Sequence, residues 1–299
     1  EIVAAPTDTV YGLFGDATND DAIQKIYRVK GRPSYNPLIV HVNGIDMAKT
    51  VGQFDNESES IANYFWNIVK KPLTIVLKLT NNNISKYVTS GLKTVALRCP
   101  YHKIAMDLIS EFNGPLAAPS ANTSNKLSPT SYSMVKNDIG HKIPLILDGG
   151  ECNIGIESTI IDLTRRPYVI LRPGGVSNED IEAFLNANIV FNTTNNNDNT
   201  VIAPGMLKKH YSPNLPLRIN ATAPQDGEAF IAFGNTNNKY DANLSAIGDL
   251  YEAAKNLFST LSKLDNPNKY NKIAIMPIPN TGIGIGINDR IKRAAYKQK

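Results

Sequence analysis

The chain has 299 residues, of which 42% are hydrophobic and 19% are charged. This composition excludes global disorder, and the length allows one large domain or two ordinary ones. A net charge of +4 is too small to indicate nucleic-acid binding by itself. No apolar run reaches the length of a membrane span, and the first residues do not form a signal peptide. We therefore expect a cytoplasmic protein without a membrane partner.

Short apolar or β-branched runs, bounded by Gly, Pro or Asn, predict a series of strands in the first part of the chain. They are Ile2–Pro6, Leu38–Val42, Leu73–Leu79, Thr94–Arg98, Leu116–Pro119, Leu145–Asp148, Ser158–Leu163 and Tyr168–Arg172. Because the first run follows Glu1 directly, we expect the natural chain to begin earlier and this strand to lack a partner. Helices are predicted at Asp21–Val29, 103–112 and 177–186, the first with Asn19 or Asp20 as N-cap and Gly31 beyond its end. The pattern predicts a mixed α/β domain over residues 1–190.

An Asn-rich stretch after residue 190 cannot bury a core, so we expect a linker or lid at 191–215. A smaller α/β domain is predicted at 216–299. Its strands are expected at Phe230–Phe233 and Lys272–Met276, and its helices at Asp249–Leu264 and near Asn288–Tyr296. The run from Thr281 to Ile287 has its glycines at the wrong spacing for a dinucleotide-binding fingerprint. It is interpreted as a flexible approach to the last helix.

The sequence contains no phosphate-binding P-loop, no legible catalytic dyad and no metal-ligand spacing. Cations and hydroxyls gather instead in five segments at strand or helix ends. These segments are Pro6–Gly12, Lys30–Leu38, Ala118–Ser124, Gly155–Ile160 and Leu171–Gly175. Each could be a turn or a helix cap only, but the ends of strands are where α/β domains bind ligands. Together they predict a nucleotide pocket in which Lys30 and Arg32 share a polyphosphate.

Read in order, the blocks PTDTVYGL, KGRPSYNPLIVHV, APSANTS, ESTIID and ILRPGG resemble the YrdC-like threonylcarbamoyl-adenylate synthases. The segments APGMLKKHYSP and TGIGIGINDRIKRAA resemble the long form with an extra C-terminal domain. The resemblance covers essentially the whole chain. It implies a YrdC-like mixed-sheet α/β domain with a concave ligand pocket, linked to a smaller Rossmann-like α/β domain.

The resemblance also implies an activity. ATP, L-threonine and bicarbonate would give threonylcarbamoyl-AMP and pyrophosphate, a nucleotidyltransferase reaction with Mg²⁺ as the expected companion of ATP. The product would pass to a tRNA threonylcarbamoyl transferase complex as the first step of threonylcarbamoyladenosine formation. A weak contact with tRNA is compatible with this role.

By motif position, the resemblance further implies site residues. L-Threonine would be bound by Thr9, His41, Arg98, Ala118 and Ser158. ATP would be bound by Arg32, Asn36, Thr94, Ser120, Asn122, Ser128, Arg172, His210 and Tyr211, with Lys30 and Arg32 as the catalytic cations and no metal held by the chain. Three residues depart from the family's usual pattern: Asp8, Phe14 and Asn125 stand where Glu, a small residue and Gly are usual. We expect these departures to affect only loop geometry.

Two other readings stay open. A carbamoyl-adenylate-forming maturation enzyme would share the first domain, but the zinc-finger and acylphosphatase-like regions of such enzymes have no counterpart here. A non-catalytic RNA-binding module would show a concentrated basic face with exposed aromatic residues. Most basic residues instead fall in the proposed pocket loops, at Arg165 and Arg166, and in the last helix.

Overall fold

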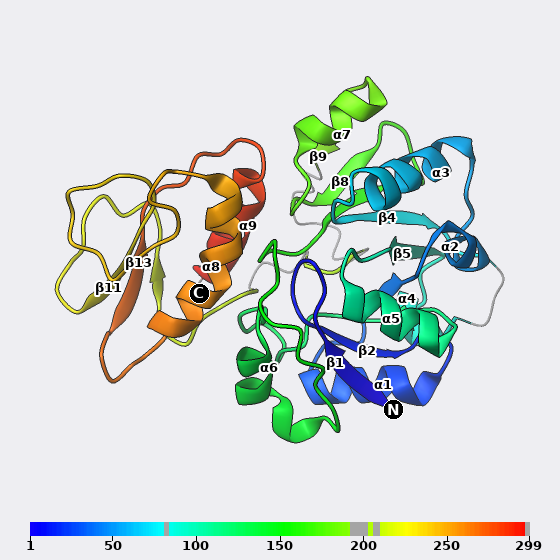
Figure 1. The fold of residues 1–299 in the computed structure, drawn as a ribbon, viewed down its shortest axis with the longest axis horizontal. Coiled ribbons are helices and arrows are strands. Elements are labelled where there is room, and N and C mark those ends of the chain that lie inside the picture. Colours follow the sequence, from blue (N-terminus) through cyan, green and yellow to red (C-terminus); the bar gives the residue numbers. More distant parts are fainter. Residues whose placement is uncertain (81–83, 192–202, 206–209, 297–299) are drawn as a thin grey trace.

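A computed structural model describes residues 1–80, 84–191, 203–205 and 210–296 and contains two α/β domains, each built on its own sheet (Figure 1). The expected linker falls largely on residues 192–202 and 206–209, which lie outside the described residues, as do the last three residues of the chain. No helix in the described ranges is long and apolar enough to cross a membrane.

The larger sheet is mixed, as expected, with the strand order β1-β2-β6-β3-β5-β4-β7-β8-β9 among the described residues. Its strands are β1 (Ile2–Ala5), β2 (Gly12–Asp16), β3 (Ile39–His41), β4 (Leu73–Lys78), β5 (Thr94–Arg98), β6 (Leu116–Ala117), β7 (Thr159–Asp162), β8 (Val169–Arg172) and β9 (Val190–Phe191). Antiparallel pairs join β1 to β2, β2 to β6 and β6 to β3, whereas β3 and β5 are parallel. This order brings the ends of β3, β5 and β6 together.

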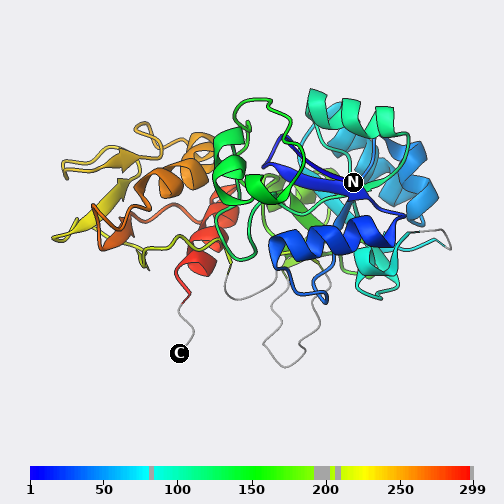
Figure 2. The ribbon, with the colours of Figure 1, turned by 90° about the horizontal axis from the view of Figure 1, so that it is seen from below.

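Helices cover both faces of this sheet. They are α1 (Asp20–Lys30), α2 (Ile45–Val51), α3 (Asn56–Ala62) continued by a π-helix (Asn63–Ile68), α4 (Lys86–Thr89), α5 (Lys103–Phe112), α6 (Tyr132–Asp138) continued by a 3-10 turn (Gly140–Lys142), and α7 (Asn178–Leu185). Figure 2 shows α1 and α5 on opposite sides of β1 and β2. The core follows this arrangement, because Ile2 packs with Ile26 of α1, whereas Ala5 packs with Ile109 of α5.

The first helix shows how local chemistry sets an element's limits. The Asn19 side chain accepts a hydrogen bond from the Ala22 amide at 2.9 Å, which caps the helix at its start. Gly31 ends it in the left-handed conformation at a φ of 59°, which glycine adopts without steric cost. Both predicted caps are confirmed. The position of Gly31 also turns the next residue, Arg32, back toward the sheet.

Three sequence predictions about the strands were wrong. The run Leu145–Asp148 forms no strand and makes only an isolated bridge, between Ile146 and Ala4. The β2 strand was missed because its sequence, GLFGD, carries two glycines, which weaken a strand signal. Its presence gives β1 an antiparallel partner, so the first strand does not lack one.

The smaller sheet is parallel throughout its described strands, in the order β10-β13-β11-β12, as a Rossmann-like domain requires. Its strands are β10 (Leu217–Arg218), β11 (Glu228–Ala232), β12 (Ala242–Asn243) and β13 (Lys272–Ile275), and its helices are α8 (Leu250–Leu264) and α9 (Gly284–Ala294). Figure 1 shows α8 and α9 between this sheet and the larger domain.

Glycines allow the two domains to meet backbone to backbone. A Cβ on Gly155 would lie 2.4 Å from the Cα of Lys255 in α8, and one on Gly286 would lie 3.0 Å from the carbonyl oxygen of Gly174. The glycine-rich run is therefore not a flexible approach to the last helix: α9 begins at Gly284 and packs with its first turns against the larger domain. Sequence periodicity could not reveal this role because it depends on the docked partner.

Candidate functional site

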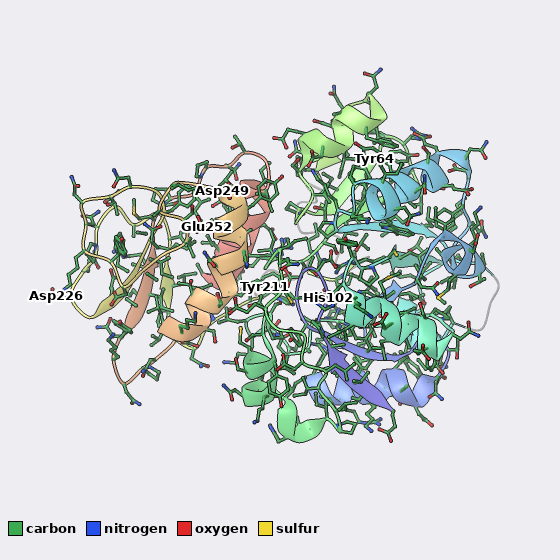
Figure 3. All side chains as sticks on the ribbon, in the orientation of Figure 1. Tyr64, His102, Tyr211, Asp226, Asp249 and Glu252 are labelled. Carbon is green, nitrogen blue, oxygen red and sulfur yellow. The ribbon has the colours of Figure 1, made fainter. Side chains whose placement is uncertain are left out.

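A concave pocket lies where the turn between β1 and β2, the segment from α1 to β3 and the loops beside β6, β7 and β8 converge. Described residues of the linker close one side, and Figure 3 shows Tyr211 between the two domains. The pocket is lined by Thr7, Val10, Gly12, Arg32, Ile39, His41, Arg98, Ala118, Pro119, Ser120, Glu157, Arg172, Pro204, Gly205, His210 and Tyr211. Eight of the predicted site residues are among them.

Three buried arginines give the pocket its positive charge: Arg32, Arg98 and Arg172 are 9%, 4% and 4% exposed. Arg32 is folded back on its own turn, with Nε donating to the Asn36 carbonyl at 3.0 Å and Nη2 to the Pro37 carbonyl at 2.8 Å. Burial lowers the pKa of Arg32 to about 10, which leaves the guanidinium charged at neutral pH. Such a cluster favours an anionic ligand with more than one charge.

Arg98 is held by the first loop of the domain. Its Nη2 donates to Asp8 Oδ1 at 2.5 Å and its Nη1 to Thr9 Oγ1 at 2.8 Å. Its Nε and Asp8 Oδ2 are buried and make no hydrogen bond among the described residues. Thr9 thus lies beside the pocket and orients Arg98, and the shorter carboxylate of Asp8 still reaches the guanidinium.

His41 lines the pocket next to Arg98 and is neutral. Burial, followed by the charge of Arg98, lowers the pKa of His41 to about 3. Its Nδ1 lies 3.3 Å from the Ile39 carbonyl, which accepts a hydrogen bond and so assigns the ring proton to Nδ1. Phe14, one of the departures from the family pattern, packs edge-on against the His41 ring with centroids 5.2 Å apart. Phe14 therefore contacts a side chain of the site. The expectation that this departure affects only loop geometry is wrong.

Arg172 is hydrogen-bonded to the loop that precedes β7. Its Nη2 donates to the carbonyl of Ser158 at 2.9 Å and to its hydroxyl at 3.1 Å, and the same hydroxyl bonds Thr74 Oγ1 at 2.7 Å. Arg172 Nη1 donates to the carbonyl of Pro204, in the linker, at 3.4 Å. Ser158 is thus a buried support for Arg172 and is not among the lining residues.

Lys30 lies behind the pocket. Its Nζ donates to the carbonyls of Ser120 and Asn122, both at 2.5 Å, and is 3.3 Å from Asn122 Oδ1. Three ammonium protons thereby meet three acceptors, and burial lowers the pKa of Lys30 well below its usual value. In this conformation the lysine holds the loop that presents Ser120 to the pocket.

The other predicted nucleotide ligands differ in placement. Asn36 is fully buried, and neither polar atom of its amide makes a hydrogen bond among the described residues. Ser128 and Asn122 are also buried, and Thr94 stands at the start of β5, but none of these four lines the pocket. The Asn122 amide donates to the carbonyls of Thr123 and Lys126, which shapes the loop from within.

Asn125 explains why glycine is usual at its position, because its φ is 69°, in the left-handed region. Asn tolerates this conformation better than most residues, so the loop keeps its path. Tyr211 is also left-handed, at a φ of 60°, and is buried against Phe258 of α8 and Arg290 of α9. Its neighbour His210 has a pKa lowered to about 3 by burial, and it is therefore neutral in the pocket wall.

Sequence reasoning missed Glu157, although its block was singled out. Glu157 is 6% exposed and is the carboxylate among the described lining residues. Burial alone would raise its pKa, but the charges of Arg290 and Arg172 and the Ser128 hydroxyl outweigh burial and lower the pKa to about 2. Its partner Arg290 belongs to the other domain. No local signal connects two residues so far apart in the sequence.

Comparisons with known proteins agree with this architecture. The family model Sua5_yciO_yrdC, described as "Telomere recombination", matches residues 1–174, and the model described as "Threonylcarbamoyl-AMP synthase, C-terminal domain" matches residues 176–296. Threonylcarbamoyl-AMP synthases of Bacillus subtilis and Pyrococcus abyssi are each 37% identical to the chain. The alignments cover 99% of this chain in both cases, and 89% and 90% of the relatives.

Solved structures give the same result. The crystal structure of Pyrococcus abyssi Sua5 complexed with L-threonine matches with a TM-score of 0.89 at 35% identity, covering 99% of this chain and 90% of the other. Full-length HypF, in a phosphate- and nucleotide-bound form, matches with a TM-score of 0.51 at 20% identity over 58% of this chain and 27% of HypF. The second likeness concerns the fold alone.

Proposed function

The chain belongs to the Sua5, YciO and YrdC family, in the form with the additional C-terminal domain, and we propose that it is a threonylcarbamoyl-AMP synthase. It would convert L-threonine, bicarbonate and ATP into threonylcarbamoyl-AMP and pyrophosphate. The observation that carries the proposal is the convergence of Arg32, Arg98 and Arg172 in one buried pocket beside a neutral histidine. Such a pocket suits a carboxylate and a polyphosphate that must be held next to each other.

L-Threonine would bind at the end of the pocket lined by His41, Arg98 and Ala118, with Thr9 and Ser158 behind this lining. The Nε of Arg98 is a donor suited to the substrate carboxylate. Because His41 carries its proton on Nδ1, its Nε2 is a hydrogen-bond acceptor for the amine or hydroxyl of threonine. Thr9 and Ser158 would act by orienting Arg98 and Arg172, to which they are hydrogen-bonded.

ATP would bind on the other side, with Arg32, Ser120, Arg172, His210 and Tyr211 around it. The amide of Asn36 is unpaired but buried outside the pocket lining, and we propose that it contacts the nucleotide once the pocket opens. Thr94, Asn122 and Ser128 do not line the pocket, so we propose that they contribute only through neighbouring loops. Lys30 would likewise act as a positioning residue for the Ser120 loop, through its bonds to the loop carbonyls.

Entry of ATP requires the pocket to open. Its free volume is about 50 Å³, whereas sites for ligands of this kind enclose about 300–1,000 Å³. Pro204, Gly205 and Tyr211 cover the space next to Arg172. We therefore assign a lid role to residues 203–205 and 210–211 within the linker at 191–215, between a catalytic domain at 1–190 and a small domain at 216–299.

The chemistry needs positioning more than a strong base. The threonine nitrogen bonds to the carbon of carbon dioxide derived from bicarbonate and loses a proton, and the resulting carbamate is an anionic nucleophile. A carbamate oxygen then attacks the α-phosphorus of ATP, and pyrophosphate leaves with the electrons of the broken phosphorus–oxygen bond. This transfer of an adenylyl group makes the enzyme a nucleotidyltransferase. Arg32 and Arg172 would stabilise the charge on the phosphates, and the closed pocket would protect the mixed anhydride from water.

Mg²⁺ does not fit as a metal held by the protein. No group of three or more His, Cys, Asp or Glu side chains in the described part of the chain could hold an ion. The carboxylate of Glu157 is already occupied by Ser128 and Arg290. Any Mg²⁺ would therefore be bound by the phosphates of ATP. The product would pass to a tRNA threonylcarbamoyl transferase complex, with tRNA touching this chain weakly.

Pyrophosphate release tests the proposal, with L-threonine and bicarbonate each supplied and omitted and the product identified by mass spectrometry. We expect release only when both are present with ATP. Release with carbamoyl phosphate instead would favour a maturation enzyme. No release from a folded protein that retains RNA on a filter would favour a binding module.

A further inference from the structure

A carboxylate stands inside the pocket to which the proposed function assigns a triphosphate, and the inference developed here rests on that function. Glu157 lines the pocket, with Oε1 accepting from Ser128 Oγ at 2.5 Å and Oε2 accepting from Arg290 Nε at 2.8 Å. An unpaired carboxylate in this position would repel the phosphates through a medium of low dielectric constant. Something must therefore compensate its charge.

The compensating charge comes from the other domain. Arg290, in α9, is fully buried, and its Nη1 also donates to the Pro173 carbonyl at 2.6 Å. The centre of its guanidinium lies 5.3 Å from the centroid of the Tyr211 ring, within the range of a cation–π contact. One side chain of the small domain thus contacts Glu157, the turn that follows Arg172, and the tyrosine that covers the pocket.

The surroundings of Glu157 show what Arg290 prevents. The charged and titratable groups acting on it come from four places: Arg172 of β8, Lys30 of α1, His210 and Tyr211 of the linker, and Arg290 of α9, whose Nη1 also donates to Asp289 Oδ2 at 3.0 Å. Among the described residues Glu157 forms an ion pair with Arg290 but none within 4.0 Å with Arg172. Arg172 therefore remains bonded to Ser158 and Pro204 and faces the pocket.

We propose that Arg290 is a positioning residue, by which the C-terminal domain neutralises Glu157, reserves Arg172 for the phosphates of ATP and holds Tyr211 against the pocket. Without the guanidinium, Glu157 would repel ATP and compete with it for Arg172. The small domain then contributes to nucleotide binding through one charge that it inserts into its neighbour, and not only by packing.

The test is ATP affinity of the full chain, measured by calorimetry at pH 6, 7 and 8. R290M is expected to bind ATP about tenfold or more weakly at pH 8, the order expected for one uncompensated charge facing an anionic ligand. The loss should shrink toward pH 6, because burial without a counter-charge raises the pKa of Glu157, and protonation then removes the repulsion. The charge-preserving R290K should stay within about threefold of the wild type at each pH.

The decisive variant is the double substitution E157Q/R290M, which removes both charges. It should recover the affinity of the wild type to within about threefold and show the same pH dependence as the wild type, to which the terminal phosphate of ATP itself contributes. A loss relative to the wild type that still varies with pH in the double variant would point to His210 instead of Glu157 and would overturn the inference. Equal ATP binding by R290M and the wild type would also overturn it.

G286A is the matched control for packing. It disturbs the seat of α9 on Gly174 without changing any charge, so any loss of affinity should be the same at all three pH values. A loss in R290M that is equally independent of pH would mean that Arg290 only packs the domains together. Should R290M fail to fold, E157Q alone decides: we expect it to bind ATP at least as tightly as the wild type, and a tenfold loss would refute the inference. A chain that binds ATP but releases no pyrophosphate contradicts the proposed activity while leaving this binding comparison decisive.

Discussion

Replacing Lys30 with methionine separates two roles for this lysine, a direct phosphate contact and support of the Ser120 loop. The substitution keeps the length of the side chain but removes the ammonium, which donates to the carbonyls of Ser120 and Asn122 and to the Asn122 amide oxygen. The Ser120 carbonyl keeps the Asn122 N–H at 3.0 Å and the amide oxygen keeps Ser120 Oγ at 2.5 Å, so the Asn122 carbonyl is the acceptor that loses its donor. A buried acceptor left without a partner costs about 1–3 kcal/mol. Part of this cost is offset because the ammonium is buried without a carboxylate in ion-pair contact among the described residues, and removing it ends its desolvation penalty.

The net loss expected for Lys30→Met is about 1–3 kcal/mol, or roughly 2–12 °C in Tm for a domain of this size. Thermal unfolding and the KM for ATP should be measured on the same preparation, and both should change together. Lys25→Met is the matched control, since Lys25 lies on the same helix and makes a surface ion pair with Glu1 that contributes about 1 kcal/mol at most. A Tm within 1 °C of the wild type combined with a loss of activity above about a hundredfold would refute the loop-support reasoning and restore a direct phosphate contact.

Three further outcomes are expected. Arg32→Ala should lower kcat/KM for pyrophosphate release by about a hundredfold or more, and a fall of less than about fivefold would exclude a phosphate contact. Because His41 has a pKa of about 3 in the folded chain and 6.5 when unfolded, its contribution to stability is complete above pH 6.5 and is lost as the pH falls toward 3. At pH 5 the stability lost through His41 amounts to about 2 kcal/mol. His41→Asn should therefore flatten the fall of Tm between pH 7 and pH 5. An unchanged slope would contradict a neutral buried ring. Gly155→Ala should lower the free energy of unfolding by at least about 3 kcal/mol, because its Cβ would meet the backbone of Lys255. Gly31→Ala, with open space around it, should lower it by only about 1–2 kcal/mol. Equal falls in Tm would mean that the domains do not dock as described.

Most of the fold could be predicted from the sequence because the patterns that define its helices and strands are local. Strand β5 and helix α5 have the predicted limits, and the caps of α1 lie at Asn19 and Gly31. Each of these depends on residues within one or two turns of chain, whose hydrogen bonds and apolar spacing are written directly in the sequence. Strand β2 escaped notice because pairing with β1 and β6, and not its own composition, makes it a strand.

Part of the candidate site could be predicted from the sequence for a related reason. Loops at strand ends carry their own turn chemistry, so the motifs containing Arg32 and Arg172 could be named as ligand-binding segments, whereas Arg98 was implied only by the family resemblance. One pocket contains all three arginines. What faces the pocket within those motifs could not be foreseen. Lys30 and Arg32 are two residues apart, yet the first turns behind the pocket and the second into it.

The sequence by itself determined most of the elements, the caps of α1 and the segments that gather at the pocket, because short-range geometry decides these. Only the tertiary structure decided which buried charges meet. Glu157 and Arg290 are 133 residues apart, and nothing in either segment names the other as its partner. Their pairing follows from the docking of α9 on the backbone of Gly174, and a charge moved from water into a closed interface requires a counter-charge wherever the fold brings one within reach.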